Sequence, residues 1–274
     1  MSATTDSAKI ARKFRLGIAL TGGGARGFAH AGALAAIEEA GFKPDIIAGV
    51  SAGSVVGALY ASGISPLRMV EIFAEQKAMS FVDFKPRGGG LFSLDPFRKF
   101  IEKNLGSYKN LEDLPIPTYI GVTDFDHGVS HEFHAGPIAD LVVASCSIPI
   151  VFSPVTINGT AFVDGGVLRN HPAWIIRDKC DFLIGVNVSP LETKLKDKAD
   201  SFLSVALRTY NLMAKANQSN DMKLCDLNIS TLEISHYRTF DLSHIKNVYV
   251  SGYANARRAL RQAGLWKQAL PEKI

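Results

Sequence analysis

A serine between glycines is the first group in this sequence that could do chemistry. Residues 49–53 read Gly-Val-Ser-Ala-Gly, a G-x-S-x-G pattern between a short apolar run and an alanine-rich stretch. A serine at a sharp turn from a strand into a helix exposes its hydroxyl oxygen, and glycines flank it because larger side chains would clash. The pattern predicts that Ser51 is a nucleophile and that Gly49 and Gly53 form the turn. A packed glycine turn without chemistry is the alternative interpretation.

A glycine-rich segment at residues 22–27 follows the first apolar run and reads Gly-Gly-Gly-Ala-Arg-Gly. It matches the dinucleotide pattern G-x-G-x-x-G, but that fingerprint needs an acid at the end of the second strand, where this chain has Gly49-Val50-Ser51. No GK[ST] is present, so a P-loop is excluded. Unhindered N–H groups at the start of a helix, with Arg26 nearby, indicate a site for a negatively charged oxygen. A structural turn is the alternative.

The third segment is Asp164-Gly165-Gly166, after the apolar run 161–163. An aspartate at the end of a strand, followed by two glycines, places a carboxylate on a loop that other groups can approach closely. Alone, this common dipeptide predicts only a turn. However, a nucleophilic serine needs a base, and none of the seven histidines lies in a distinctive context. His30 is expected to pack or cap within a helix.

Apolar runs and helical periodicity show which elements must position these segments. We expect strands over 14–20 and 46–50 and helices over 27–40 and 53–62, joined by short connections. This order predicts parallel βαβ units, and hence an α/β fold of three layers, α/β/α, with a mainly parallel central sheet. The further expected strands are 119–125, 129–133, 155–157, 161–163, 182–188 and 229–234, and the further expected helices are 66–76, 95–104, 138–145, 198–216 and 245–262.

No repeat, low-complexity tract or linker divides the chain. We expect a flexible N-terminus over residues 1–13 and a single domain over 14–274, with a helical C-terminal part from about 195 to 274. The connection 77–93 contains three consecutive glycines and is long enough to predict a lid or access loop.

Composition excludes several classes of protein. With 47% hydrophobic and 20% charged residues, the chain is not a disordered protein. The net charge of +4 is spread along the sequence without a dense basic stripe, so no nucleic-acid partner is expected. The three cysteines are too scattered for a disulfide framework or a zinc site, and we expect them to be small buried residues.

Two apolar stretches bear on location. The run 16–20 is too short for a secretory signal, which predicts a cytoplasmic protein. The uncharged stretch 46–64 has the length of a membrane span, but its glycines and serines favour a buried strand, a turn and a buried helix.

In this order, the three glycine-marked segments resemble the motifs of the patatin-like phospholipase family: GGGxRG at 22–27, GxSxG at 49–53 and DGG/A at 164–166. Residues 144–149, Ala-Ser-Cys-Ser-Ile-Pro, with Phe152 and Pro154, are similar to the family's block before the aspartate loop. The resemblance covers about residues 14–190. It weakens beyond, although 240–260 is similar to the terminal helix of compact bacterial members of the neuropathy-target-esterase-like branch.

The resemblance implies a patatin-like serine hydrolase with a Ser–Asp dyad, which accounts for the lack of a distinctive histidine. Ser51 would attack a fatty acyl ester, Asp164 would take its proton, and water would release the fatty acid from an acyl-serine. Gly165 and Gly166 complete the aspartate loop, and Arg26 supports the glycine loop. The implied oxyanion hole comprises Gly22, Gly23, Gly24, Ala25, Arg26, Gly27 and Ala52.

The implied activity is that of a phospholipase A or lysophospholipase, without a cofactor or metal. The expected substrate is a phospholipid or another fatty acyl ester. Contact with the inner face of the membrane and the oligomeric state are left open. A set of apolar residues is expected to form either ordinary core, a wall for the acyl chain or a face toward lipid: Leu91, Phe92, Leu94, Phe97, Phe100 and Ile101.

Three alternatives stay open at this point. An acyltransferase or thioesterase could use the same serine turn, and a scaffold could keep the fold without chemistry. A metal hydrolase is the third, because potential ligands crowd residues 124–134. The strand-like alternation there places His131 and His134 on opposite faces, which favours a solvated hairpin. The crowded residues are Asp124, Asp126, His127, His131, Glu132 and His134.

Overall fold

The two apolar runs at the start of the sequence form neighbouring parallel strands, β1 (Phe14–Leu20) and β2 (Ile46–Val50). Between them runs α1 (Phe28–Glu39), and α2 (Ala52–Ala61) follows β2 directly. The stretch 46–64 is therefore a strand, a turn and a helix, as its glycines predicted. The computed structural model describes residues 14–86, 89–189 and 201–267; the expected flexible N-terminus lies outside them.

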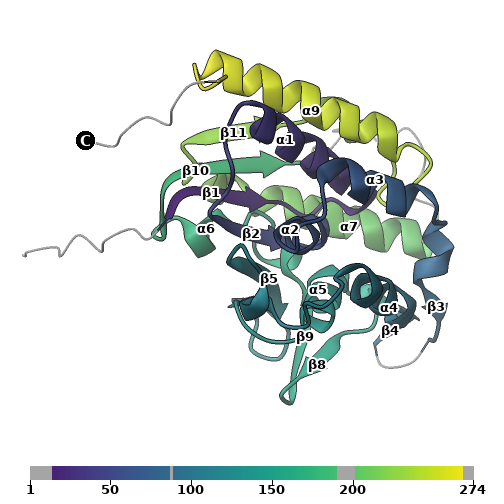
Figure 1. The fold of residues 1–274 in the computed structure, drawn as a ribbon. Coiled ribbons are helices and arrows are strands. Elements are labelled where there is room, and N and C mark those ends of the chain that lie inside the picture. Colours follow the sequence, from purple (N-terminus) through teal and green to yellow (C-terminus); the bar gives the residue numbers. More distant parts are fainter. Residues whose placement is uncertain (1–13, 87–88, 190–200, 268–274) are drawn as a thin grey trace, which may run out of the picture.

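The central sheet has eight strands with helices on both faces (Figure 1). Its parallel part runs in the order β11 (Leu227–Ser230), β10 (Cys180–Asn187), β1, β2, β5 (Thr118–Asp124). Antiparallel strands β9 (Thr160–Asp164), β8 (Val155–Ile157) and β6 (Val129–Phe133) extend it beyond β5. The predicted three-layer fold with a mainly parallel sheet is confirmed.

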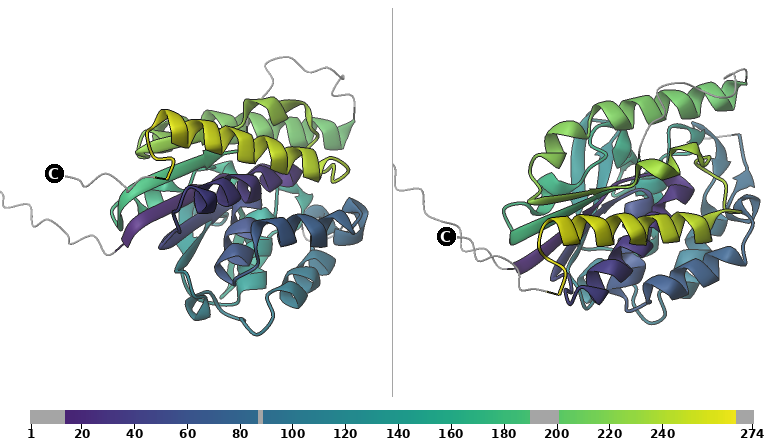
Figure 2. Two further views of the ribbon diagram at one scale, coloured as in Figure 1. Left: turned by 45° about the horizontal axis from the view of Figure 1, so that its top comes forward. Right: turned by 90° about the horizontal axis from the view of Figure 1, so that it is seen from above.

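Helices on the two faces enclose two apolar cores. The larger core includes side chains of α1, α2 and α5 (Ile138–Cys146), and the smaller one, on the other face, includes α6 (Ala173–Ile176). Helix α9 (Ile245–Gln262) packs along α1 (Figure 2). The remaining helices are α3 (Pro66–Ala74), α4 (Asp95–Asn104), α7 (Phe202–Ala216) and α8 (Ser219–Met222). No helix of the described residues is long and apolar enough to cross a bilayer.

The connection 77–93 is more ordered than expected. It contains strands β3 (Asp83–Phe84) and β4 (Gly90–Ser93), which form a second, three-stranded sheet with β7 (Ile150–Phe152). The expectation of a loop was wrong there because β4 pairs with a strand far away in the sequence, and no local pattern shows such a partner. The predicted strand 229–234 is also corrected: β11 ends at Ser230, and Leu232–His236 is a 3₁₀ turn.

Candidate active site

Ser51 occupies a strained turn between β2 and α2. Its backbone has φ 50° and ψ −123°, an uncommon conformation for a residue with a side chain. A Cβ atom on Gly49 would lie 2.4 Å from the carbonyl oxygen of Gly53, and one on Gly53 would lie 2.1 Å from that of Leu20. The turn therefore requires glycine at both positions, as the sequence pattern predicted.

Ser145, at the end of α5, holds this turn from behind. The N–H of Ser51 donates to its hydroxyl oxygen at 2.8 Å, and that hydroxyl donates to the carbonyl oxygen of Gly121 at 2.7 Å. All three groups are buried, so the hydrogen bonds are shielded from water and fix Ser51 relative to β5. Ser145 was noticed only as part of a family block, because a single serine in a helix carries no sign of this contact.

The register of the sheet brings Asp164 to the same place. Val50 pairs with Gly121 in β5, and the next residue, Val122, pairs with Asp164 at the end of β9. Asp164 is fully buried. The Ser51 side chain is close enough to help lower the pKa of Asp164 by hydrogen bonding. The structure thus brings together the two residues that the resemblance pairs.

Hydrogen bonds occupy one oxygen of the Asp164 carboxylate. Oδ1 accepts the N–H of Gly166 at 2.8 Å and the hydroxyl of Tyr210 at 2.9 Å. Oδ2 accepts no hydrogen bond from any described residue. Burial raises the pKa of Asp164 to about 6, although hydrogen bonding from Gly166, Ser51 and Tyr210 lowers it. At neutral pH, Oδ2 is therefore an available acceptor for a proton.

The glycine loop lies directly beside the serine turn. A Cβ atom on Gly22 would lie 3.1 Å from the Cβ of Ser51, and one on Gly27 would lie 2.6 Å from that of Ala52. Gly24 has φ +58°, and a side chain there would meet the carbonyl oxygen of Thr239 at 2.2 Å. The approaches of Gly27 to Ala52 and of Gly24 to Thr239 are too close for a side chain, and that of Gly22 to Ser51 leaves little room for one.

The N–H groups of the predicted oxyanion residues are not equivalent. Gly22 donates to the carbonyl oxygen of Asn170, and Ala25 donates to that of Thr239, so both are already used. Within the described part of the chain, no hydrogen bond occupies the N–H groups of three other predicted residues, Gly23, Gly24 and Ala52. Among these predicted residues, Gly23, Gly24 and Ala52 therefore have N–H groups that remain available to a ligand.

Arg26 braces the glycine loop from within the protein. It is buried, and its Nε donates to the carbonyl oxygen of Gly23 at 3.3 Å. Its Nη2 donates to Oδ1 of Asn211 in α7 at 3.4 Å. Burial lowers the pKa of Arg26 to about 10, so it stays charged at neutral pH. These contacts are those of a residue that holds the loop in shape.

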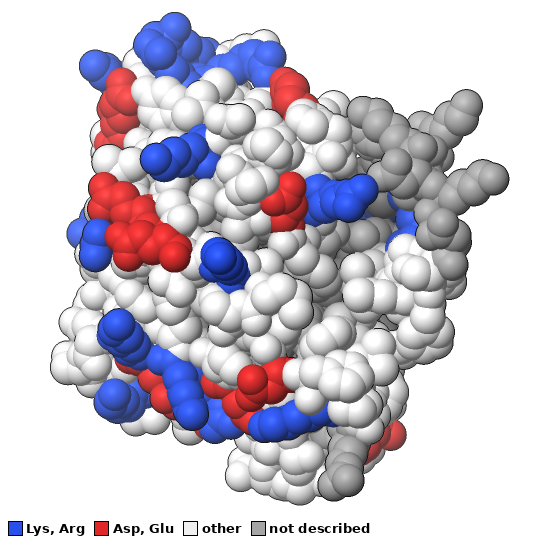
Figure 3. All heavy atoms as spheres, turned by 90° about the vertical axis from the view of Figure 1, so that its right-hand side faces the viewer, with Lys and Arg blue, Asp and Glu red and all other residues white. Residues whose placement is uncertain are grey.

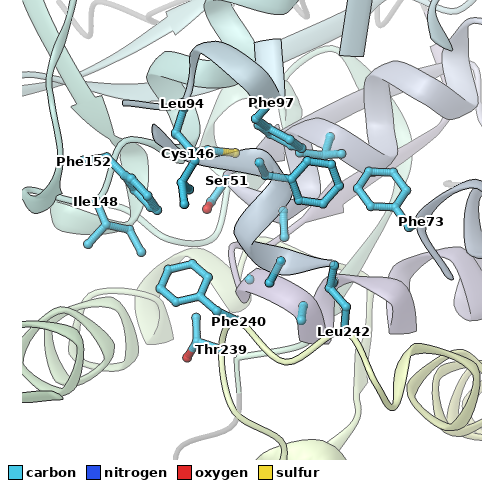
Figure 4. A pocket seen from close by; sticks show the side chains of 18 of the residues that line it. Ser51, Phe73, Leu94, Phe97, Cys146, Ile148, Phe152, Thr239, Phe240 and Leu242 are labelled. Atoms are coloured by element: carbon cyan, nitrogen blue, oxygen red, sulfur yellow. The ribbon is translucent and has the colours of Figure 1, made fainter. Parts of the chain in front are cut away.

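An apolar cavity of about 240 Å³ opens at Ser51 (Figure 4). Among the six apolar residues singled out in the sequence, Phe92, Leu94 and Phe97 line it. The other three, Leu91, Phe100 and Ile101, lie outside it. At the mouth, Met79 is 70% and Phe240 39% exposed. Figure 4 also shows Cys146 beside Ser51, a half-buried free thiol, while Cys180 is buried and Cys225 half-buried.

The residues that suggested a metal site form the hairpin of β5 and β6. Asp124 accepts hydrogen bonds from His127 in its turn. No group of three potential metal ligands occurs in the chain within the described ranges. His30 is buried in α1 against the carbonyl oxygen of Thr21 at 2.7 Å, where it packs as expected.

Comparisons with known proteins show the family to which the chain belongs. The family model of patatin-like phospholipases matches residues 18–176. Lysophospholipase NTE1 of Cryptococcus neoformans is 33% identical over 214 residues, which cover 72% of this chain and 13% of that protein. An uncharacterised NTE family protein of Mycobacterium bovis is 32% identical over 181 residues, covering 65% of this chain and 50% of that protein. The structure of VipD from Legionella pneumophila is similar with a TM-score of 0.53 and 16% identity, over 95% of this chain and 72% of that one.

The similarity to VipD supports the fold alone. The chain spans half or less of the length of the two curated relatives. The family model, in contrast, covers more than half of the 274 residues and includes all three glycine-marked segments. The chain belongs to the patatin-like phospholipase family.

Proposed function

We propose that this chain is a serine lipid acyl hydrolase of the phospholipase A or lysophospholipase type. The observation that carries the proposal is the Asp164 carboxylate, fully buried beside Ser51 with no hydrogen bond from a described residue to its Oδ2, while Ser51 itself lines an apolar cavity. A hydroxyl needs a base to become a nucleophile, and an apolar cavity accepts a fatty chain. The name of the fungal relative, a lysophospholipase, favours the same class of substrate.

The reaction begins when Oγ of Ser51 attacks the ester carbonyl and its proton moves to Oδ2 of Asp164. The negative oxygen of the tetrahedral intermediate accepts hydrogen bonds from the free N–H groups of Gly23, Gly24 and Ala52. Removal of one such donor from a serine hydrolase costs on the order of 10²–10³ in rate. Collapse expels the alcohol, which takes the proton from Asp164 and leaves an acyl-serine.

Water then attacks the acyl-serine. Asp164 accepts a proton from this water, the second tetrahedral intermediate forms at the same N–H groups, and its collapse releases the fatty acid. The proton returns from Asp164 to Ser51. The carboxylate thus carries one proton in each half of the cycle, and no metal or cofactor enters the balance.

The mouth of the cavity favours lipid that is part of an aggregate. Met79 and Phe240 line the cavity and also expose apolar surface to solvent. Figure 3 shows the side of the molecule on which β3 lies, where residues other than Lys, Arg, Asp and Glu lie between several clusters of charged residues. Apolar surface around an opening is typical of proteins that contact a lipid layer.

The test is mass-spectrometric profiling of lipids incubated with the wild type, Ser51→Ala and Asp164→Asn. We expect the wild type to release fatty acid, and both variants to release almost none. A fluorophosphonate probe should label the wild type and not Ser51→Ala, with or without EDTA. A folded wild type that is not labelled would favour a scaffold, and acyl groups found on an acceptor other than water would favour an acyltransferase.

A further inference from the structure

Helix α7 and the residue that follows it contact both loops of the proposed site through polar side chains. Tyr210 contacts Asp164, Asn211 accepts a hydrogen bond from Arg26, and Asn217 donates to the carbonyl oxygens of Gly166 and Val167 at 2.9 and 3.1 Å. The family model ends at residue 176, so α7 lies outside the matched region. None of the sequence motifs includes this helix.

The hydroxyl of Tyr210 fixes the orientation of the base. Tyr210 is only 8% exposed, and its hydroxyl donates to Oδ1 of Asp164 at 2.9 Å, while the N–H of Gly166 donates to the same oxygen. With two donors on Oδ1, rotation of the carboxylate would break both hydrogen bonds. The remaining oxygen, Oδ2, is thereby left as the acceptor without a donor among the described residues.

Gly166 is a glycine because of this hydroxyl. A Cβ atom at residue 166 would lie 2.2 Å from the hydroxyl oxygen of Tyr210 and 3.0 Å from its ring carbon. Real Cβ atoms do not approach other atoms so closely, so a side chain at residue 166 would have to displace the Tyr210 hydroxyl. The second glycine of the aspartate loop and Tyr210 therefore act as a pair, although they lie on different elements.

We propose that Tyr210 is the positioning residue of the catalytic base, holding the Asp164 carboxylate in its productive orientation and ionised at neutral pH. The proposal rests on the proposed function, since it concerns the base of that reaction. A donor to a carboxylate stabilises its charged form. The tyrosine remains protonated because burial raises its own pKa well above the ordinary value.

Two other ionisable groups lie near this pair. Cys146, at the end of α5, interacts with Asp164, and Arg26 in the glycine loop interacts with Tyr210. Burial raises the pKa of the Cys146 thiol, so it is neutral at pH 7, and Arg26 is charged there. Neither group changes its charge between pH 5 and 8, and an acid limb of activity in this range therefore reports Asp164.

The experiment measures kcat and KM for 4-nitrophenyl butyrate between pH 5 and 9 in the wild type and in Tyr210→Phe. Loss of the hydroxyl should move the acid limb of kcat/KM upward by about one pH unit, a tenfold loss of acidity of the base. The plateau of kcat should fall roughly tenfold with KM nearly unchanged, because orientation rather than binding is impaired.

Tyr60→Phe is a matched control. Tyr60 is also buried and its hydroxyl also donates to a carboxylate, Oε1 of Glu38 at 2.7 Å, but Glu38 lies in α1 and belongs to none of the three glycine-marked segments. Its pH profile should be that of the wild type. If folded Tyr210→Phe keeps the wild-type kcat and the wild-type acid limb of kcat/KM, the proposal is overturned. An equal shift of this acid limb in Tyr60→Phe would overturn it as well.

A second variant covers the case in which Tyr210→Phe does not fold. Gly166→Ala keeps the tyrosine but fills the space of its hydroxyl, so it should shift the acid limb in the same direction, and a wild-type profile would overturn the proposal. Ser51→Ala separates the two levels of inference. If Ser51→Ala keeps full esterase activity, the proposed function itself fails. If Ser51→Ala is inactive but the acid limb of Tyr210→Phe stays where it is in the wild type, only the role of Tyr210 fails.

Discussion

Replacing Asp164 with asparagine should abolish hydrolysis and, at the same time, stabilise the folded protein above pH 6. Asparagine has nearly the same shape, and its carbonyl oxygen can accept the hydrogen bonds that Gly166 and Tyr210 donate to Oδ1. The variant therefore keeps the contacts of the loop. It loses a fully buried negative charge, which is costly in a folded protein.

The size of the effect follows from the pKa of the carboxyl. Burial raises the pKa of Asp164 from 3.8 to about 6, despite its hydrogen bonds. Between these values the folded protein holds a proton that the unfolded chain has lost, so the free energy of unfolding falls as the pH rises through this window. A shift of roughly two units corresponds to about 3 kcal/mol. The free energy of unfolding of Asp164→Asn should exceed that of the wild type by about 3 kcal/mol at pH 8 and by only about 1 kcal/mol at pH 4.5.

The assay is urea unfolding of both proteins at pH 4.5 and pH 8, followed by circular dichroism. Other titrating groups, including the buried His30, are common to both proteins and cancel in the difference. Asp221→Asn is a matched control, because Asp221 is buried against Arg169 and its loss leaves that cation unpaired; it should destabilise the protein. A gain in the free energy of unfolding of Asp164→Asn that does not depend on pH, or a loss of it at pH 8, would refute the reasoning.

Three further predictions concern activity and the serine turn. The kcat/KM of the wild type should rise with pH and level off above about pH 6, since the base must be ionised. Ser145→Ala leaves the N–H of Ser51 without its acceptor and should lower the free energy of unfolding by about 1–3 kcal/mol, measured in urea. Gly24→Ala drives a Cβ atom against the carbonyl oxygen of Thr239 and should abolish fluorophosphonate labelling. Gly63→Ala, at a similar positive φ but with open space around it, should still be labelled.

The elements around the proposed site could be predicted because their signals are local. The strand, turn and helix on either side of Ser51 lie within about fifteen residues, and the glycines mark places where a side chain would meet the backbone of a neighbouring segment. The clash between a Cβ on Gly53 and the carbonyl oxygen of Leu20 is of this kind. Such positions tolerate only glycine, so they can be recognised in a single sequence.

The contacts that the sequence did not reveal join segments far apart. Nothing in an apolar helix distinguishes Tyr210 from a core residue, and its partner Asp164 is visible only in the folded chain. The same reason explains β4, whose partner β7 comes after two further helices. In the glycine loop, the sequence showed a row of N–H groups. It did not show that two of them, those of Gly22 and Ala25, already donate to carbonyl oxygens of other segments.

The three glycine-marked segments form a single packed unit, and this explains why a helix from elsewhere is needed. A Cβ on Gly27 would meet that of Ala52, and a Cβ on Gly165 would meet the carbonyl oxygen of Gly121 in β5, so the lack of side chains lets these segments pack closely. Backbone groups can orient the proposed nucleophile and the proposed oxyanion donors. They offer the carboxylate of Asp164 a single N–H, from Gly166, and one hydrogen bond does not fix the rotation of the carboxylate. The second donor has to come from a side chain long enough to cross the gap left by a glycine, and Tyr210 of α7 supplies it.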